Sequence, residues 1–312
     1  MKAMSSRLIL TYNSKFSHDG LGAQVHRIVA IYSLSRILNT GYLHTGIKHT
    51  TWHPLDNFAN TDEFQEYIIN INKLFNIVSE TTTIYHEKID SNQITFFTLF
   101  TIALRSFVSR RTFLVAICEP FRVLDFINHG YRLKPPFPLF QNLVMNTREE
   151  YKDTTIAIHY RHGSGDFSTY HKQNQPRQLP LSLFADKVKK LVEVNNLETY
   201  SIVFVTDAPE KDIFFKIPQD QIHLWEGTPG YRSGNLYIKG LSKPDVEKAF
   251  DYQHHIKFIR GGNPITALAT LTGTDYLIMS QSSLSYVAAI YSHGTVLFPK
   301  GFWHPKMQEW GY

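Results

Sequence analysis

The segment IAIHYRHGSGDF, residues 156–167, joins an apolar run to side chains that could bind an anion. Its arginine offers a planar fork of donors suited to phosphate, with two histidines and an aspartate close by. The glycines and the serine among them are also good turn formers, so a plain turn is the competing interpretation. If the segment binds a ligand, the diphosphate of a nucleotide sugar fits its chemistry. The polar residues of this strand end are His159, Arg161, His162 and Asp166.

Two later apolar runs also end in polar residues. Asp207 follows IVFV and could accept hydrogen bonds from a ribose or a base, or cap the next segment. Ser280, Ser282 and Ser283 follow YLIM and open a helix, where backbone amides bind anions; a simple cap is the alternative. Ligands of an open parallel sheet bind beyond the carboxyl ends of its strands. The three strand ends would therefore line one site if they are adjacent in the sheet.

A fourth candidate is the loop SHDGLGAQ, residues 17–24, after the first predicted strand. Gly20 and Gly22 would allow a ligand to approach the backbone closely, and His18 and Asp19 add titratable groups. The competing interpretation is a tight turn between a strand and a helix, with Asp19 as the helix cap.

Other chemistries find less support in the residue pattern. The dinucleotide fingerprint G-x-G-x-x-G is absent, because Ala23 and Arg27 stand where glycines would be needed. The single cysteine, Cys118, excludes a disulfide within the chain and a cysteine-based metal site. The pair His254-His255 lacks the spacing of metal ligands, and G-x-S-x-G is also absent. We therefore expect no metal and no cofactor.

Charge and composition limit the classes of binding partner and the cellular compartment that the sequence predicts. The net charge is +5 over 312 residues without a dense basic run, which suits a small polyanion and does not predict nucleic-acid binding. No apolar run is long enough for a signal peptide or a membrane span. The run FFTLFTIAL, residues 96–104, is expected to form a buried helix, and SFVSRRTF, residues 106–113, a solvated helix end. These features predict a cytoplasmic protein.

Alternating strands and helices must position the polar strand ends. Residues 7–12 predict a strand, and VHRIVAIYSLSRILNTG a helix that stops at Gly41. The second half alternates regularly, as is typical of a parallel sheet with right-handed crossovers. Further strands are expected at 41–47, 154–161, 200–210, 221–227, 275–283 and 295–299, and helices at 180–197, 263–274 and 284–294.

The stretch from 50 to about 150 is harder to order and reads as mostly helical, including 111–120. One helix is expected to start at Thr61, which has an acidic first turn after it. The proline-rich segment 131–140 is the best candidate for a linker. The sequence thus predicts two α/β lobes, an acceptor-side lobe at 1–145 and a nucleotide-sugar-binding lobe at 146–312.

Three segments together resemble a known family. HDGLGAQVHRIVAIYSLSR, IAIHYRHGSGDF and DYLIMSQSSLSYVAAIYSHG are similar, in this order, to motifs of the GDP-fucose-dependent fucosyltransferase superfamily, which includes α-1,2, α-1,6 and protein O-fucosyltransferases. The direct resemblance covers about a fifth of the chain. It implies a GT-B fold, with two Rossmann-like lobes, parallel sheets and an interlobe cleft. It also implies inverting, metal-independent transfer of a sugar from a nucleotide diphosphate donor to a glycan hydroxyl, and fucose is the sugar that the resemblance favours.

The resemblance also implies roles for single residues. Arg161 would bind the β-phosphate and stabilise the leaving nucleotide, and Asp207 would lie near the nucleotide. No motif fixes the catalytic base; Asp19, His18 and Asp166 are the candidates, and Asp19 is preferred because it lies in the interlobe loop. The implied donor-binding set is Gly20, Gly22, His159, Arg161, Asp166, Asp207, Ser280, Ser282 and Ser283.

Two positions depart from the family pattern. Ala23 stands where an asparagine is usual, and His162 where many members have a second arginine. Two alternatives therefore stay open. The first is the same fold with another donor, such as a xylosyl or other pentosyl nucleotide sugar. The second is a catalytically inactive nucleotide- or sugar-binding module.

Overall fold

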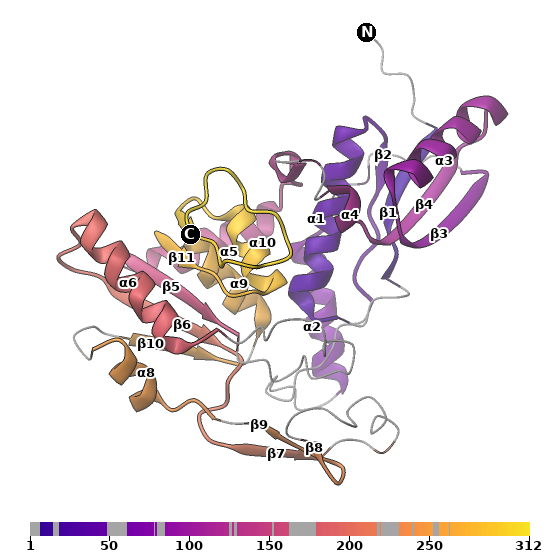
Figure 1. Ribbon diagram of the computed structural model, residues 1–312. Coiled ribbons are helices and arrows are strands. Elements are labelled where there is room, and N and C mark those ends of the chain that lie inside the picture. The colour runs from indigo at the N-terminus through magenta and orange to yellow at the C-terminus, as the bar shows by residue number, and fades with distance from the viewer. Residues whose placement is uncertain are drawn as a thin grey trace. The chain divides into compact units, whose positions relative to one another are not determined.

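The chain forms two compact units in a computed structural model, shown in Figure 1. Among the described residues, one unit takes those up to Leu143 together with Trp303–Gln308, and is called unit 1. Unit 2 takes Val144–Phe302 and Glu309–Tyr312. The structure describes residues 7–14, 19–48, 61–77, 79, 85–124, 127, 130–151, 153–161, 179–216, 219, 231–238, 240–251, 256–261 and 263–312.

Unit 1 is built on a four-stranded sheet in the order β2-β1-β4-β3, with every neighbouring pair parallel. Helix α1 follows β1, and nearly every residue of this helix is buried. Its end differs from the expectation, because the chain turns at Asn39 (φ 51°) while Gly41 already opens β2. The strands are β1 (Leu8–Tyr12), β2 (Gly41–Leu43), β3 (Glu87–Gln93) and β4 (Phe113–Glu119), and α1 spans Leu21–Ile37.

The middle of the chain holds two strands that the mostly helical interpretation missed. The segment 111–120 contains β4, whose branched and aromatic residues are buried between β1 and β3. The expected helix at Thr61 is confirmed as α2 (Thr61–Leu74). The proline-rich segment is not a simple linker, since α5 begins at Pro138, a position where proline suits a first helical turn. The other elements here are α3 (Phe96–Ser109), α4 (Phe121–Leu124), η2 (Gly130–Leu133) and α5 (Pro138–Glu149).

Unit 2 is built on a five-stranded sheet in the order β10-β6-β5-β11-β12, again with every neighbouring pair parallel. The regular alternation read from the second half is therefore confirmed, as is the predicted class: α/β, with two parallel-sheet units. The strands are β5 (Thr155–Tyr160), β6 (Ser201–Thr206), β10 (Ile256–Arg260), β11 (Tyr276–Ile278) and β12 (Thr295–Leu297). The helices are α6 (Leu181–Asn195), α8 (Lys243–Ala249), α9 (Pro264–Gly273) and α10 (Ser283–Tyr291).

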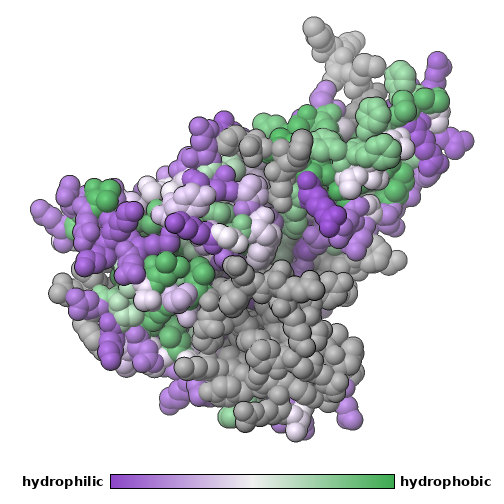
Figure 2. Space-filling model, in the orientation of Figure 1, coloured by the Kyte–Doolittle hydropathy of each residue, from purple (hydrophilic) through white to green (hydrophobic). Residues whose placement is uncertain are grey.

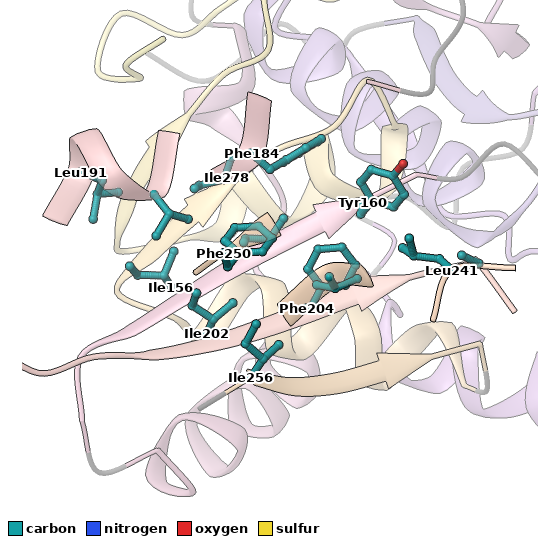
Figure 3. Packing of buried hydrophobic residues seen from close by; sticks show 14 residues of the cluster. Ile156, Tyr160, Phe184, Leu191, Ile202, Phe204, Leu241, Phe250, Ile256 and Ile278 are labelled. Atoms are coloured by element: carbon teal, nitrogen blue, oxygen red, sulfur yellow. The ribbon is translucent and has the colours of Figure 1, made fainter. Parts of the chain in front are cut away.

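One face of this sheet carries an apolar core of unit 2 (Figure 3). Ile156 and Tyr160 of β5 and Phe204 of β6 pack there against side chains of α6 and α8, such as Phe184. Because successive side chains of a strand point to opposite faces, His159 points away from this core. The sheet therefore fixes which face of β5 presents the histidine.

A small antiparallel sheet, which the sequence did not indicate, follows β6. It has the order β7-β9-β8, with β7 at Ile213–Lys216, β8 at Tyr231–Arg232 and β9 at Asn235–Ile238. The strand expected at 221–227 lies outside the described residues.

The helix expected to be buried at 96–104 is only half buried. Leu99, Ile102 and Ser106 of α3 face the protein, whereas Phe97 and Phe100 are 80% and 67% exposed. The solvated end expected at 106–113 is confirmed at Arg110 and Arg111, which are exposed. Of the helices in the described part of the chain, none is long and apolar enough to cross a membrane.

Candidate functional site

The strand order of unit 2 creates a switch point between β5 and β11. The chain builds outward from β5 through β6 to β10, and then returns to place β11 and β12 on the other side of β5. In open α/β sheets ligands bind outside the carboxyl ends of the strands at this point. Polar residues from β5, β6 and β11, predicted as separate strand ends, are brought to this edge because the three strands are neighbours in the sheet.

Arg161 and Asp207 form an ion pair at this edge. Arg161 directly follows β5 and Asp207 directly follows β6, and Arg161 Nη1 lies 3.1 Å from Asp207 Oδ2. The two side chains are 23% and 13% exposed, so the pair is largely shielded from water. Asp207 thus holds the guanidinium in place at the sheet edge.

His159 and Ser280 join the two strands across the switch point. The Nδ1 atom of His159 lies 2.9 Å from Ser280 Oγ, and both residues are buried. Burial lowers the pKa of His159 to about 4; Asp207 opposes this shift and Arg161 adds to it. At neutral pH the ring is therefore uncharged, with one nitrogen that donates and one that accepts a hydrogen bond.

The amino end of α10 lies just beyond β11. Ser282 is its N-cap, and its Oγ accepts a hydrogen bond from the backbone N–H of Leu284 at 3.3 Å. The capping interpretation therefore holds for Ser282, while Ser283 is the first helical residue. The positive end of the helix dipole remains at this place, which favours a nearby anion.

Arg260 is a second guanidinium at the same sheet edge, and the sequence analysis missed it. It ends β10 and lies opposite Thr206 of β6. Its Nη1 donates to the carbonyl of Ala208 at 3.4 Å, while its buried Nη2 has no hydrogen-bond partner among the described residues. Burial lowers its pKa, with Glu210 opposing. The sequence holds a partial signal, since IKFIRGG, like IAIHYRHG, ends in arginine followed by glycine within two residues, although Lys257 interrupts its apolar run.

In unit 1, the loop after β1 is held by hydrogen bonds of its own. Gln24 Nε2 donates to the carbonyl of Asp19 at 2.8 Å, and Tyr12 Oη donates to Gln24 Oε1 at 3.0 Å. Gly20, not Asp19, is the N-cap of α1, and Gly22 lies buried in the first turn. The interpretation of Asp19 as a helix cap is therefore wrong.

Asp19 is instead part of a charge cluster that the sequence did not predict. Arg27 of α1 is buried, and its Nη2 lies 2.6 Å from Asp19 Oδ2 and 2.5 Å from Glu119 Oε1 at the end of β4. Burial disfavours the charge of Arg27, but the two carboxylates outweigh it and raise its pKa. In the sequence Arg27 stands out only as a residue that breaks a glycine motif, yet in the structure it links β4, α1 and the loop.

A buried aromatic cluster lies next to this arginine. His26 Nε2 is 2.5 Å from Tyr131 Oη, and the rings of His26 and His304 lie 4.4 Å apart edge to face. Burial lowers the pKa of His26 well below its usual value, and His304 and Arg27 lower it further. The cluster brings a residue of the segment Trp303–Gln308 against α1 within unit 1.

Some predicted site residues lie outside the described part of the chain, namely His18, His162 and Asp166. In the part that is described, no group of three or more His, Cys, Asp or Glu side chains is arranged to hold a metal ion. The other predicted residues fall into two sets. The set in unit 2 is His159, Arg161, Asp207, Ser280, Ser282 and Ser283, and the set in unit 1 is Asp19, Gly20 and Gly22.

Comparisons with known proteins give only distant likenesses. No protein-family model and no curated protein matches the chain. The fucosyltransferase NodZ from Bradyrhizobium aligns with a TM-score of 0.37 and 11% identity over 95% of this chain and 96% of its own. NodZ α-1,6-fucosyltransferase soaked with GDP-fucose aligns with a TM-score of 0.38 and 11% identity, over 98% of this chain and 99% of its own. The E. coli heptosyltransferase WaaC with ADP-2-deoxy-2-fluoro heptose aligns with a TM-score of 0.39 and 9% identity, over 97% of this chain and 92% of its own. TM-scores this low do not establish a shared fold, so the fold class rests on the order and direction of the strands.

Proposed function

We propose that the chain is an inverting, metal-independent glycosyltransferase that moves a sugar from a nucleoside diphosphate donor to a glycan hydroxyl. Fucose is the sugar that we propose for this donor. The observation that carries this proposal is the cluster at the switch point of unit 2. There a carboxylate-anchored arginine, a neutral buried histidine and a helix amino end meet at one sheet edge. The single cysteine is consistent with the cytoplasmic location that we include in the proposal.

The reaction divides between a nucleophile and a leaving group. The acceptor hydroxyl oxygen attacks the anomeric carbon, and the bond from that carbon to the diphosphate oxygen breaks. The diphosphate leaves with the electron pair, and the hydroxyl proton passes to a base. Attack from the side opposite the leaving group inverts the anomeric carbon without a covalent enzyme intermediate.

Arg161 is assigned to the leaving diphosphate. A guanidinium held by Asp207 needs little reorganisation as negative charge develops, and preorganised donors of this kind are often the largest catalytic contribution. The amino end of α10 adds partial positive charge, and Arg260 supplies the second guanidinium that His162 does not. His159, being neutral, can hydrogen-bond the donor without adding charge.

Asp19 is assigned as the base that accepts the hydroxyl proton, with His18 as the alternative. The Asp19 carboxylate is 55% exposed, although Arg27 contacts its Oδ2. No atom of the described residues lies within 4 Å of the place where a Cβ of Gly20 would stand, which leaves room on that side for a ligand against this loop.

The first test compares nucleotide binding and turnover in matched arginine variants. We expect the parent to bind GDP and to transfer fucose from GDP-fucose. Arg161→Lys keeps the charge beside Asp207 but loses the planar fork, and should weaken GDP binding about tenfold or more, equal to about 1.4 kcal/mol. Arg260→Gln should weaken it by a smaller factor. Calorimetric titration measures both, and thermal melts confirm that the variants are folded.

Arg148→Lys is the matched control. Arg148 pairs with Asp275, which precedes β11 and so lies at the opposite, amino edge of the same sheet. This variant should bind GDP like the parent. Equal GDP affinity in Arg161→Lys and the parent would refute the site. Binding of UDP in place of GDP would keep the site and change the donor, and binding without product from any donor would favour the inactive module.

A further inference from the structure

Helix α3 carries an exposed apolar face that the proposed reaction does not use. We call it the α3 face. Figure 2 shows the hydrophobic side chains gathered over this helix, at the upper right. At about 100° per residue they cover one continuous face of roughly 120°, next to but separate from the buried face. The α3 face consists of Phe96, Phe97, Phe100, Leu104, Phe107 and Val108, which are 41%, 80%, 67%, 51%, 70% and 74% exposed.

This arrangement is unusual for a helix of a soluble domain. A surface helix commonly has one apolar stripe toward the core and polar residues on the other side. In α3 the core stripe is present as Leu99, Ile102 and Ser106, yet large apolar residues occupy a second stripe that faces water. Contiguous exposed apolar patches mark interaction sites more often than single exposed residues do.

The charged residues that directly follow the α3 face are positive. Arg110 and Arg111 follow the helix directly and are exposed. No acidic residue occurs in the sequence between Asp90 and Glu119. Arg105 pairs with Glu87 of the neighbouring strand at 3.0 Å. The face therefore combines aromatic side chains with uncompensated positive charge at one end.

We propose that the α3 face docks on an anionic membrane surface. A helix with aromatic and aliphatic residues on one side and basic residues at its border is suited to lie in the plane of the lipid headgroups. At 14 residues α3 is about 21 Å long, too short for a hydrocarbon core of about 30 Å. Anionic headgroups would supply the negative charge that this segment lacks.

A second copy of the chain fits the same face less well. Standard protein interfaces bury about 800 Å² on each partner, whereas a helix about 21 Å long and 10 Å wide has a footprint of only roughly 200 Å². A copy apposed through α3 would also bring no carboxylate from residues 91–118 to Arg110 and Arg111. The observations therefore favour lipid over self-association.

Vesicle co-sedimentation of the full chain tests this proposal. We expect the parent to bind vesicles of phosphatidylcholine mixed with phosphatidylglycerol, to bind pure phosphatidylcholine more weakly, and to be released by salt. Phe97→Gln/Phe100→Gln/Phe107→Gln should abolish binding. Arg110→Asn/Arg111→Gln should weaken it about tenfold or more. Asn suits the first site because Arg110 has a left-handed backbone with φ 55°.

Phe214→Gln is the control, because Phe214 lies in unit 2 and is 75% exposed. It should bind vesicles like the parent. A parent that ignores anionic vesicles, or a folded triple variant that binds as well as the parent, would overturn the proposal. A parent dimer that becomes a monomer in the triple variant, seen by light scattering, would assign the face to a second copy instead. None of these readouts depends on a sugar donor.

Discussion

At the scale of single residues, His159 shows how burial selects a chemical role. A histidine with an ordinary pKa would be partly charged near neutral pH and would attract a phosphate by charge. Burial lowers the pKa of His159 to about 4, so its ring stays neutral beside Ser280. The positive charge at this edge is left to Arg161 and Arg260, whose guanidinium groups keep their charge at neutral pH.

Gly20 allows folding and ligand contact to be separated. Its backbone, with φ −65° and ψ 168°, is open to any residue, and a Cβ there would meet no atom of the described part of the chain within 4 Å. Gly20→Ala should therefore change the free energy of unfolding by less than about 1 kcal/mol. If the donor or acceptor lies against this loop, the added methyl group should raise KM several-fold.

The measurement is steady-state kinetics beside urea unfolding of the same protein. Gly294→Ala provides the contrast, because its Cβ would lie 2.3 Å from the carbonyl oxygen of Asp275. That variant should have a clearly lower free energy of unfolding than the parent, because the added Cβ clashes with backbone. Unchanged KM in a normally stable Gly20→Ala protein would show that no substrate approaches the loop closely.

At the scale of elements, Arg27 joins three parts of unit 1 that are remote in sequence. Replacing it by leucine would leave Asp19 and Glu119 facing each other without their shared counter-ion. Because both carboxylates are partly exposed, water can compensate in part. We expect Arg27→Leu to lower the free energy of unfolding by about 1–3 kcal/mol.

Urea unfolding of Arg105→Leu gives the comparison for this prediction. Arg105 also pairs with a glutamate, Glu87, but its side chain is 59% exposed. Exposed pairs contribute at most about 1 kcal/mol. Equal losses in the two variants would mean that the Arg27 cluster is no more than a surface ion pair.

Sequence patterns predicted the buried strands best. The strands β1, β5 and β6 are continuous apolar runs, and they were placed correctly. The strand β4, FLVAICE, is equally apolar but was interpreted as helical, because a short apolar run alone does not distinguish a buried strand from a buried helix. The strands β3 and β10 were also missed. β3 is a polar edge strand, EKIDSNQ, and β10 borders its sheet with alternating charged residues, IKFIR.

The same limits decided which site residues could be found. Arg161, Asp207 and Ser280 follow correctly placed strands, so their meeting at one edge could be anticipated. Arg260 was missed together with β10. Arg27 was missed for another reason, since its partner Glu119 is 92 residues away and no local pattern links them.

At the scale of the whole molecule, buried histidines in both units should make stability depend on pH. His26, His44 and His159 all have pKa values lowered by burial, the last two to about 4. In the unfolded chain, each of these histidines would have the ordinary histidine pKa of about 6.5. Between about pH 6.5 and 4 the unfolded chain therefore binds more protons, and stability falls as the pH falls.

His159→Gln isolates one part of this dependence. Each buried histidine contributes up to about 1.4 kcal/mol per pH unit in that window, so the variant should show a shallower slope of unfolding free energy against pH. Urea unfolding at several pH values measures the slope. The exposed His293 supplies the control substitution, and a slope that stays as steep as that of the parent would contradict the role of His159.

The division of unit 1 along the chain has a consequence for synthesis on the ribosome. Trp303–Gln308 belongs to unit 1 but follows all five strands of the large sheet of unit 2. At about 5–20 residues per second, the roughly 160 residues after Leu143 take about 8–32 s to translate. During that interval His26 and Phe121 await the ring of His304, which packs against both. Unit 1 can thus begin to fold early, but its packing is completed only after all strands of the unit 2 sheet have been synthesised.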